Sequence, residues 1–294
     1  MTSQQNASQM PAPRKLRLAI MGEFSSGKST LTNLLLGTDP LPTKVTATQL
    51  PPVWIAQGTD DPFLENTHGQ KTPFHIQNLA GIDLKETRLV RLFLTSDILQ
   101  MCDLIDMPGI SDPNMPAEIW EGLIAEIDCV IWCTPANQSW RQSEAALWDS
   151  FPKSLQDQSL LLITHSDKLR DTSERDKVLK RVRRETDGLF AGIYPISVTQ
   201  AIAAQEDQNA WENSGADAFV NHLVDILTRA QTCVYDRVAA APETSPYVVE
   251  TGIPPRSEPL PARSAQTTFT TLKTKDGPKT PRPTKEDAKT TFQD

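Results

Sequence analysis

Six short apolar segments are spaced along the first 165 residues of the chain. Each has the length of a β-strand, and most are aliphatic or β-branched throughout. Continuous apolar runs of this kind, without polar alternation, are typical of strands that are buried on both faces in a parallel sheet. The segments span residues 16–21, 52–56, 88–94, 101–107, 129–134 and 159–165.

Helical periodicity fills the intervals between these segments. Leu31, Leu34 and Leu35 share one face of a predicted helix after the first strand, and Gly37 is placed to end it. Strands that alternate with helices predict a doubly wound α/β fold, in which a mostly parallel central sheet lies between two layers of helices. The other predicted helices span residues 116–127, 142–151, 173–190 and 215–240.

Composition divides the chain into three parts. Residues 1–13 are polar, and we expect a disordered lead-in there. Residues 14–239 hold the predicted elements and form the expected domain. Residues 240–294 contain nine prolines and few large apolar side chains. Because such a segment cannot bury enough surface to offset its ordering entropy, we expect a proline-rich disordered tail. Docking of residues 277–283 as a polyproline helix is the alternative.

The charge balance excludes some partners. The chain has a formal net charge of −8, and residues 16–239 carry 19 Lys and Arg against 30 Asp and Glu. Nucleic acids and anionic membranes are bound by concentrated basic side chains, which displace counterions. We therefore expect no nucleic-acid partner and no broad anionic-membrane surface.

Cysteines and apolar runs indicate the compartment. The four cysteines lie mostly in apolar segments, without a CxxC pair or zinc-ligand spacing, and we interpret them as buried thiols. The sequence shows no signal-peptide pattern and no apolar run near the roughly 20 residues of a membrane span. We expect a cytoplasmic protein, with any membrane association peripheral, at the inner membrane.

Residues 22–29, GEFSSGKS, match the phosphate-binding pattern GxxxxGK[ST]. The glycines Gly22 and Gly27 allow successive backbone N–H groups to form an anion nest at a helix N-terminus. Lys28 is expected to bridge the β- and γ-phosphates, and the Ser29 hydroxyl to bind Mg²⁺. The alternative is a Gly/Ser turn with a solvated lysine, which the preceding strand and following helix disfavour.

The segment LIDMPG places Asp106 and Gly109 at the end of another apolar strand. A carboxylate there can hold an Mg²⁺-bound water, and the Gly109 N–H can sense the γ-phosphate, because glycine permits a peptide flip. An ordinary turn after a strand is the alternative. Behind a phosphate-binding loop, the metal-binding interpretation is the stronger one.

The segment THSD ends a further strand and predicts guanine binding. Asp167 can accept two hydrogen bonds from the N1 and exocyclic amino groups of guanine, a pattern that adenine cannot offer. The usual motif is [NT]KxD, so His165 stands where a lysine is expected after Thr164. Its ring could stack on the nucleotide, or it could be an ordinary surface histidine.

Two weaker candidates complete the predicted nucleotide site. Ser197 follows one more strand-like stretch and could add backbone contacts to the guanine edge. The Thr-rich segment between the loop and the second strand should contain a switch threonine for Mg²⁺. Thr48 is our choice and Thr46 the reserve.

Taken together, these motifs resemble the GTPase domain of the dynamin superfamily, particularly its bacterial dynamin-like members. The resemblance covers roughly residues 15–235 and is carried by GEFSSGKSTLTNLLLG, LPTKVTATQLPPV and RLFLTSDILQMCDLIDMPGI. It implies a three-layer P-loop GTPase fold, binding of GTP and GDP, and phosphate contacts from Ser26 and Thr30 beside the loop residues named above. It also implies catalysis after two GTPase domains meet face to face, as a homodimer or a heterodimer.

The resemblance gives Ser25 and Phe24 particular roles. Ser25 takes the place that coordinates a monovalent cation, K⁺ or Na⁺, which supplies charge during hydrolysis. Phe24 stands where eukaryotic dynamins have a glutamine that orients the attacking water, and bacterial members commonly have an apolar residue there. Phenylalanine cannot orient water by hydrogen bonding, so we expect slow hydrolysis without dimerisation or a partner.

Two functions follow from these expectations. The first is a GTPase that hydrolyses GTP to GDP and phosphate as a nucleotide-controlled switch, with Ser25, Lys28 and Thr48 as catalytic residues. The second is a GTP-binding interaction module with negligible turnover that recruits a partner at a membrane. No helical stalk pattern follows residue 239, so a stalk-bearing dynamin-like partner is expected to supply that part. An ATP-dependent P-loop kinase is disfavoured, because it has no use for a THSD strand end.

Overall fold

The computed structural model describes residues 14–41, 50–76, 82–110 and 117–239. At positions 117, 118, 120 and 230–239 only the backbone is described. All described residues belong to one unit, residues 1–244. The expected lead-in, residues 1–13, and the expected tail, residues 240–294, lie outside the described residues.

Nine strands form one mixed sheet, in the order β4-β3-β5-β2-β6-β1-β7-β8-β9. From β6 to β9 every neighbouring pair is parallel. Strand β2 runs antiparallel to β6 but parallel to β5. The strands are β1 (Leu16–Gly22), β2 (Val53–Gln57), β3 (Phe63–Asn66), β4 (Lys71–Pro73), β5 (Thr87–Leu94), β6 (Cys102–Asp106), β7 (Cys129–Pro135), β8 (Leu160–Thr164) and β9 (Gly192–Pro195).

The mostly parallel sheet and all six predicted strands are confirmed, each to within one residue at either end. The sequence did not predict the hairpin of β3 and β4, which pairs antiparallel with β5. Its strands are half-buried or exposed. They therefore lack the continuous apolar run that marks the buried strands.

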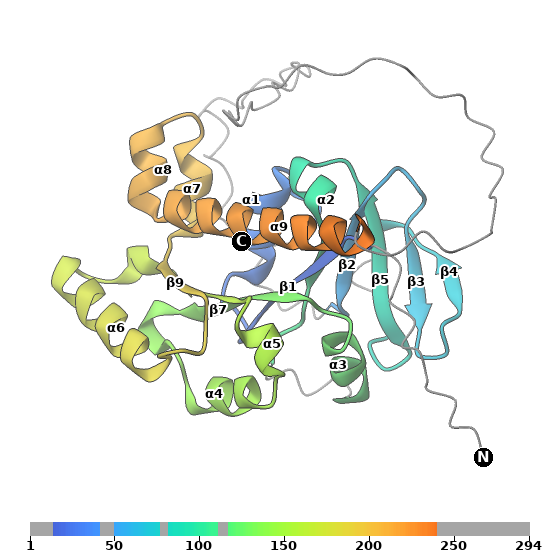
Figure 1. Ribbon diagram of the computed structural model, residues 1–294, viewed down its shortest axis with the longest axis horizontal. Helices are drawn as coiled ribbons and strands as arrows, with labels where there is room; N and C mark the ends of the chain where they lie inside the picture. Colours follow the sequence, from blue (N-terminus) through green and yellow to red (C-terminus); the bar gives the residue numbers. More distant parts are fainter. Residues whose placement is uncertain (1–13, 42–49, 77–81, 111–116, 240–294) are drawn as a thin grey trace, which may run out of the picture. The chain divides into compact units, whose positions relative to one another are not determined.

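Helices cover both faces of the sheet. They are α1 (Lys28–Leu36), α2 (Asp97–Met101), α3 (Ala117–Ile124), α4 (Gln142–Asp149), α5 (Lys153–Gln156), α6 (Thr172–Glu185), α7 (Val198–Ala204), α8 (Gln208–Ser214) and α9 (Ala216–Ala239). Figure 1 shows α1, α2, α7, α8 and α9 on one face, and α3 to α6 on the other. The three-layer arrangement is thereby confirmed. Within the part of the chain that the structure describes, no helix has both the length and the apolarity to cross a membrane.

The side chains of β1 divide the interior into two cores. Leu18 and Ile20 point into the core beneath α1 and α9, whereas Ala19 and Met21 point into the core beneath α3 and α4. All four side chains are fully buried. Strand β1 is therefore the centre of the fold, and its C-terminal end is held from both faces.

The predicted helices differ in detail from the observed ones, and α3 and α4 end at Ile124 and Asp149, two to three residues before the predicted ends. Helix α1 ends at Gly37 as expected, with that residue in the left-handed conformation at φ 69°. Its buried leucines are Leu31 and Leu36, because Leu34 and Leu35 lie at the edge of the core. The helix predicted over 173–190 ends at Glu185. Beyond it the chain turns back, so that the Phe190 ring stacks on Trp148 with 4.3 Å between ring centroids.

A buried carboxylate lies inside the aromatic core beneath α4. Glu144 is completely shielded from solvent. Its oxygens accept hydrogen bonds from Trp132 Nε1 at 2.8 Å, Thr134 Oγ1 at 3.0 Å and the Arg141 N–H at 2.8 Å. Burial raises the pKa of Glu144. One side chain thus satisfies three buried donors and joins α4 to β7.

Replacing Glu144 by alanine should destabilise the protein by on the order of 2–4 kcal/mol, because three buried donors lose their partner at once. Urea unfolding followed by circular dichroism measures this loss. Asp149→Ala, on the exposed end of the same helix, is the matched control and should change stability by less than about 0.5 kcal/mol. Equal effects of the two substitutions would contradict this account.

Candidate functional site

The predicted nucleotide-binding motifs meet at the C-terminal ends of the parallel strands. The phosphate-binding loop follows β1, Asp106 ends β6, and Thr164 ends β8. Ligands of open α/β sheets bind at this edge, where neighbouring strands send their connections to opposite faces. The sheet therefore brings together motifs that are more than 70 residues apart.

The loop can form only with glycine at two positions. A Cβ atom at Gly22 would lie 2.0 Å from the Cys133 carbonyl oxygen, and the φ of Gly22 is 137°. Gly27 adopts φ 86° as the N-cap of α1. Ser25 is also left-handed, at φ 56°, which is uncommon for a residue with a side chain. The backbone thus has the strained shape that is typical of an anion nest.

Lys28 lies within the loop that precedes it. Its side chain is buried, and Nζ donates a hydrogen bond of 2.7 Å to the Glu23 carbonyl oxygen. Burial lowers the pKa of Lys28, and the charge of nearby Asp106 opposes that shift. A buried ammonium is costly unless it is paired. The position therefore favours an anionic ligand.

Asp106 is hydrogen-bonded to two hydroxyl groups of α1. Ser29 Oγ donates to Oδ2 at 2.7 Å, and Thr32 Oγ1 donates to Oδ1 at 3.3 Å. Burial raises the pKa of Asp106 to about 6, whereas both hydrogen bonds and Lys28 act in the opposite direction. The carboxylate and the Ser29 hydroxyl are hard oxygen donors side by side, which is the chemistry that Mg²⁺ prefers. These residues therefore fit the predicted metal ion.

Ser26 gives a second sign of a ligand in the loop. Its Oγ atom is the one buried side-chain polar atom without a hydrogen-bond partner among the described residues. Leaving a buried hydroxyl unsatisfied costs free energy, and such groups in native structures call for an explanation. A phosphate oxygen in the loop would satisfy this hydroxyl. Thr30, also predicted to contact phosphate, lies half-buried on the first turn of α1.

The segment after β6 packs directly on the phosphate-binding loop. A Cβ atom at Gly109 would lie 2.9 Å from the Phe24 nitrogen, so glycine is required for this close approach. The Ile110 N–H donates to the Gly22 carbonyl oxygen at 3.2 Å. Phe24 itself is 54% exposed, the most exposed large hydrophobic side chain of the described residues. Gly109 is thus within contact of the loop, as a γ-phosphate sensor would be.

The end of β8 also contacts the loop. Thr164 Oγ1 donates to the Ser26 carbonyl oxygen at 2.8 Å, and His165 Nε2 lies 3.2 Å from the Ser25 carbonyl oxygen. Asp167 lies in the short 3-10 turn Ser166–Lys168 and is exposed. It is therefore accessible to a base.

Ser197 is placed differently from the other predicted contacts. It is fully buried, and its Oγ accepts a hydrogen bond from the Gln200 N–H at 3.3 Å as the N-cap of α7. Its own N–H donates to the Ser214 carbonyl oxygen. Thr48 and Thr46, the expected switch threonines, lie outside the described residues.

Some residues of the site were not predicted from the sequence. Thr32 lies three residues after Ser29 on the same helical face, and this spacing could have indicated it. Ser143 Oγ donates to Glu23 Oε1 at 3.1 Å and so ties the loop to α4. Glu23 and Ser143 are 120 residues apart and belong to no common motif, so no local signal pointed to this contact.

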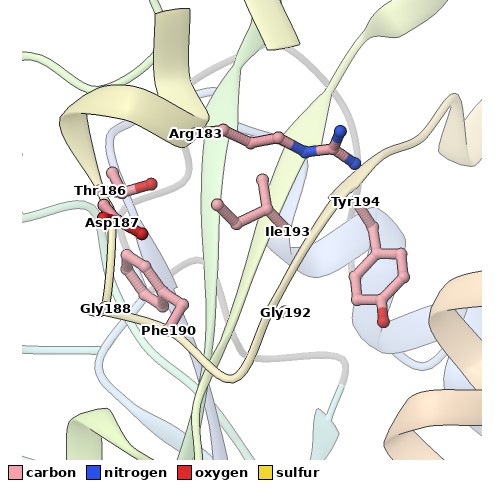
Figure 2. A pocket seen from close by; sticks show the side chains of 8 residues that line it. All are labelled: Arg183, Thr186, Asp187, Gly188, Phe190, Gly192, Ile193 and Tyr194. Carbon is pink, nitrogen blue, oxygen red and sulfur yellow. The ribbon is translucent and has the colours of Figure 1, made fainter. Parts of the chain in front are cut away.

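A cavity of about 430 Å³ lies elsewhere, along β9 and the end of α6. Figure 2 shows the side chains that line it, and none of them belongs to the predicted nucleotide site. It has no cluster of buried polar groups comparable to Lys28, Ser29 and Asp106. The loop at the strand ends is therefore the better candidate for the functional site.

One family model matches the chain, and a relative and solved structures are similar to it. The model of the dynamin family matches residues 18–164. Dynamin-like protein 2 of Campylobacter jejuni subsp. jejuni serotype O:23/36 (strain 81-176) is 27% identical over 228 residues, which cover 75% of this chain and 36% of that protein. The chain thus matches about a third of the length of this relative.

The fold is similar to that of two solved structures of an oligomerised bacterial dynamin pair. That pair provides a mechanism for the long-range sensing and tethering of membranes. The first has a TM-score of 0.52 and 22% identity, covering 76% of this chain and 36% of that chain. The second has a TM-score of 0.60 and 16% identity, covering 77% and 41%.

Asp106→Asn should stabilise the ligand-free protein at pH 7.5 by about 1–3 kcal/mol, because it removes a buried charge while keeping an acceptor for Ser29. Folding raises the pKa of Asp106 from 3.8 to about 6, so the charged form costs stability above pH 6. This cost disappears as the pH falls from 6 towards 4. Urea unfolding at several pH values measures the difference.

If Asp106 is a ligand of Mg²⁺, the same substitution should abolish Mg²⁺-dependent nucleotide binding at every pH, and binding by the wild type should weaken as the pH falls, because protons compete with the metal for the carboxylate. Asp149→Asn, on the exposed end of α4, is the control and should change neither property. An Asp106→Asn variant that is less stable than the wild type at pH 7.5 would contradict the prediction.

Proposed function

This chain belongs to the dynamin family, and we propose that it binds GTP with Mg²⁺ and hydrolyses it to GDP and phosphate as a nucleotide-controlled switch. One observation carries the proposal: Ser29 and Asp106 are joined by a hydrogen bond of 2.7 Å beside the buried Lys28. A hydroxyl, a carboxylate and an ammonium at the N-terminus of a helix together form a site for a metal-bound phosphate.

Each residue has a distinct role in this proposal. Lys28 exchanges its contact with the Glu23 carbonyl oxygen for the β- and γ-phosphates. The N–H groups of residues 22–30 surround the phosphates. Ser29, Asp106 and Thr48 hold Mg²⁺, which neutralises charge on the phosphate oxygens when it is bound. Gly109 donates its N–H to the γ-phosphate.

Hydrolysis proceeds by attack of water on the γ-phosphorus. The bond from that phosphorus to the β–γ bridging oxygen breaks, GDP leaves with the electron pair, and the water proton passes to the released phosphate. Lys28 and the loop N–H groups stabilise the charge that develops on these oxygens. Ser25 coordinates a monovalent cation, K⁺ or Na⁺, that adds to this stabilisation. The water is positioned by backbone groups or by a second GTPase domain.

Guanine selectivity is assigned to Asp167. Its carboxylate is exposed two residues after His165, whose ring contacts the loop, and can accept from the N1 and amino groups of guanine. Thr164 is assigned to the same end of the site, where its hydroxyl donates to the Ser26 carbonyl oxygen of the loop. The backbone at Ser197, the N-cap of α7, is proposed to add contacts to the guanine edge.

The proposed partner is a second GTPase domain that meets the nucleotide face, in a homodimer or in a heterodimer with a stalk-bearing dynamin-like protein. The similarity in fold to an oligomerised bacterial dynamin pair supports association of this kind. Membrane association is then peripheral, at the inner membrane, and reached through the partner from the cytoplasm.

A second candidate function is a GTP-binding interaction module with negligible turnover. It is favoured by Phe24, a residue of the loop that is 54% exposed and whose ring cannot orient water by hydrogen bonding. In this case GTP binding alters the surface that recruits the partner, and release of GTP rather than its hydrolysis resets the switch.

The guanine assignment predicts that GTP binds at least about 100-fold more tightly than ATP, because adenine leaves Asp167 without its two donors. Isothermal titration calorimetry with both nucleotides in Mg²⁺ measures the ratio. Asp167→Asn should shift the preference from GTP to xanthosine triphosphate, whose 2-oxo group accepts where guanine donates. Lys28→Ala should lose binding of both. Equal affinity of the wild type for GTP and ATP would refute the assignment.

Turnover separates the two candidate functions. A GTPase that works as a dimer should show a single-turnover rate that rises with protein concentration and increases again when K⁺ replaces a larger cation such as tetramethylammonium. Ser25→Ala should abolish the response to K⁺. A rate that responds to neither protein concentration nor cation would favour the interaction module.

A further inference from the structure

The contact between His165 and the phosphate-binding loop joins two strained residues. Ser25 and His165 both have φ 56°, and they are two of the four residues other than glycine with positive φ among those that the structure describes. His165 Nε2 lies 3.2 Å from the Ser25 carbonyl oxygen. Left-handed backbone in residues with a side chain persists only where the surroundings hold it. The contact between the two residues is one of those that hold them, and the Lys168 N–H, which donates to the His165 carbonyl oxygen at 3.0 Å, is another.

The geometry fixes the direction of the hydrogen bond. A carbonyl oxygen can only accept, so Nε2 must carry the proton and donate to Ser25. In the neutral ring the Nδ1 atom then has the lone pair.

The histidine ring lies against the phosphate-binding loop. A Cβ atom built on Gly27 would be 3.9 Å from both Cε1 and Nε2 of His165, and 4.0 Å from Cβ of Thr164. Thr164 Oγ1 donates to the Ser26 carbonyl oxygen at 2.8 Å. Two successive residues at the end of β8 therefore hold the carbonyl groups of two successive residues of the loop.

Holding these carbonyl groups determines where the loop N–H groups point. In a trans peptide the C=O and the following N–H point in opposite directions. When the Ser25 and Ser26 carbonyls face β8, the N–H groups of Ser26 and Gly27 face the inside of the loop. The Ser26 N–H indeed lies 3.3 Å from the Glu23 carbonyl oxygen, the same oxygen that accepts from Lys28 Nζ.

We infer that His165 is a positioning residue that shapes the anion nest through Ser25, and that it is not a guanine-selecting residue. The effect of His165 on GTP binding rests on the proposed GTPase function. The contact of His165 with the loop requires no nucleotide. Guanine selection stays with Asp167. Because Ser25 is also the proposed cation ligand, His165 links the base-binding end of the site to its catalytic end.

The test compares His165→Ala with His165→Gln. Both variants carry a Cβ atom, so the left-handed backbone conformation at position 165 costs them a similar free energy. Only glutamine keeps a side-chain N–H that can reach the Ser25 carbonyl oxygen. Hydrogen–deuterium exchange of the nucleotide-free protein reports the loop directly. We expect residues 22–27 to exchange several-fold faster in His165→Ala than in the wild type, and His165→Gln to restore slow exchange. His68→Ala, in the exposed β3–β4 hairpin, is the control and should leave the loop unchanged.

A second measurement separates positioning from base recognition. Loss of one neutral hydrogen bond should weaken binding of GTP by His165→Ala about 3- to 10-fold, while the ratio of GTP to ATP affinity stays at the wild-type value. Unchanged exchange of the loop in His165→Ala would overturn the inference, and so would a reduced GTP to ATP ratio. If the wild type binds no GTP, the proposed function fails, but the exchange measurement still decides the role of His165.

Discussion

The parallel pairing of β1 with both β6 and β7 is the constraint on which the rest of the structure depends. It places the end of β1 in the centre of the sheet, where Gly22 meets the Cys133 carbonyl at a distance that excludes any side chain. The chain must then leave the sheet in a tight loop and enter α1. Asp106 ends the neighbouring strand at the same level, and so it reaches the first turn of that helix.

The site places charge where burial is costly. Lys28 and Asp106 are both buried. Desolvation lowers the pKa of Lys28 and raises the pKa of Asp106, so that the neutral form of each is favoured. Ser29, Thr32 and the Glu23 carbonyl oxygen offset part of this cost by hydrogen bonding. A buried charge of this kind lowers the stability of the folded protein until a ligand of opposite charge pairs with it. Functional sites often carry such a stability cost. Glu144 differs, because three donors satisfy it within the fold.

Sequence reasoning succeeded where the physical signal is local and strong. The buried strands have continuous apolar runs, and the phosphate-binding loop has a fixed spacing of glycine, lysine and serine, so both could be located closely. It failed for short elements on the surface. The β3–β4 hairpin is half exposed, and α7 and α8 each have only seven residues. The antiparallel pairing of β2 with β6 leaves no mark in the sequence at all.

The sequence by itself determined which residues are candidates for the chemistry: Lys28, Ser29 and Asp106 for the proposed phosphate contacts, and Thr164 and Asp167 for the proposed base contacts. Their residue types and spacing are sufficient to propose them, because each motif and its neighbouring strand and helix are local. Only the tertiary structure decided what holds them. Ser143 contacts Glu23 from 120 residues away, Thr164 contacts Ser26 from 138, and His165 contacts Ser25 from 140. Such contacts arise from the order of strands in the sheet, which long-range packing sets and local sequence does not encode.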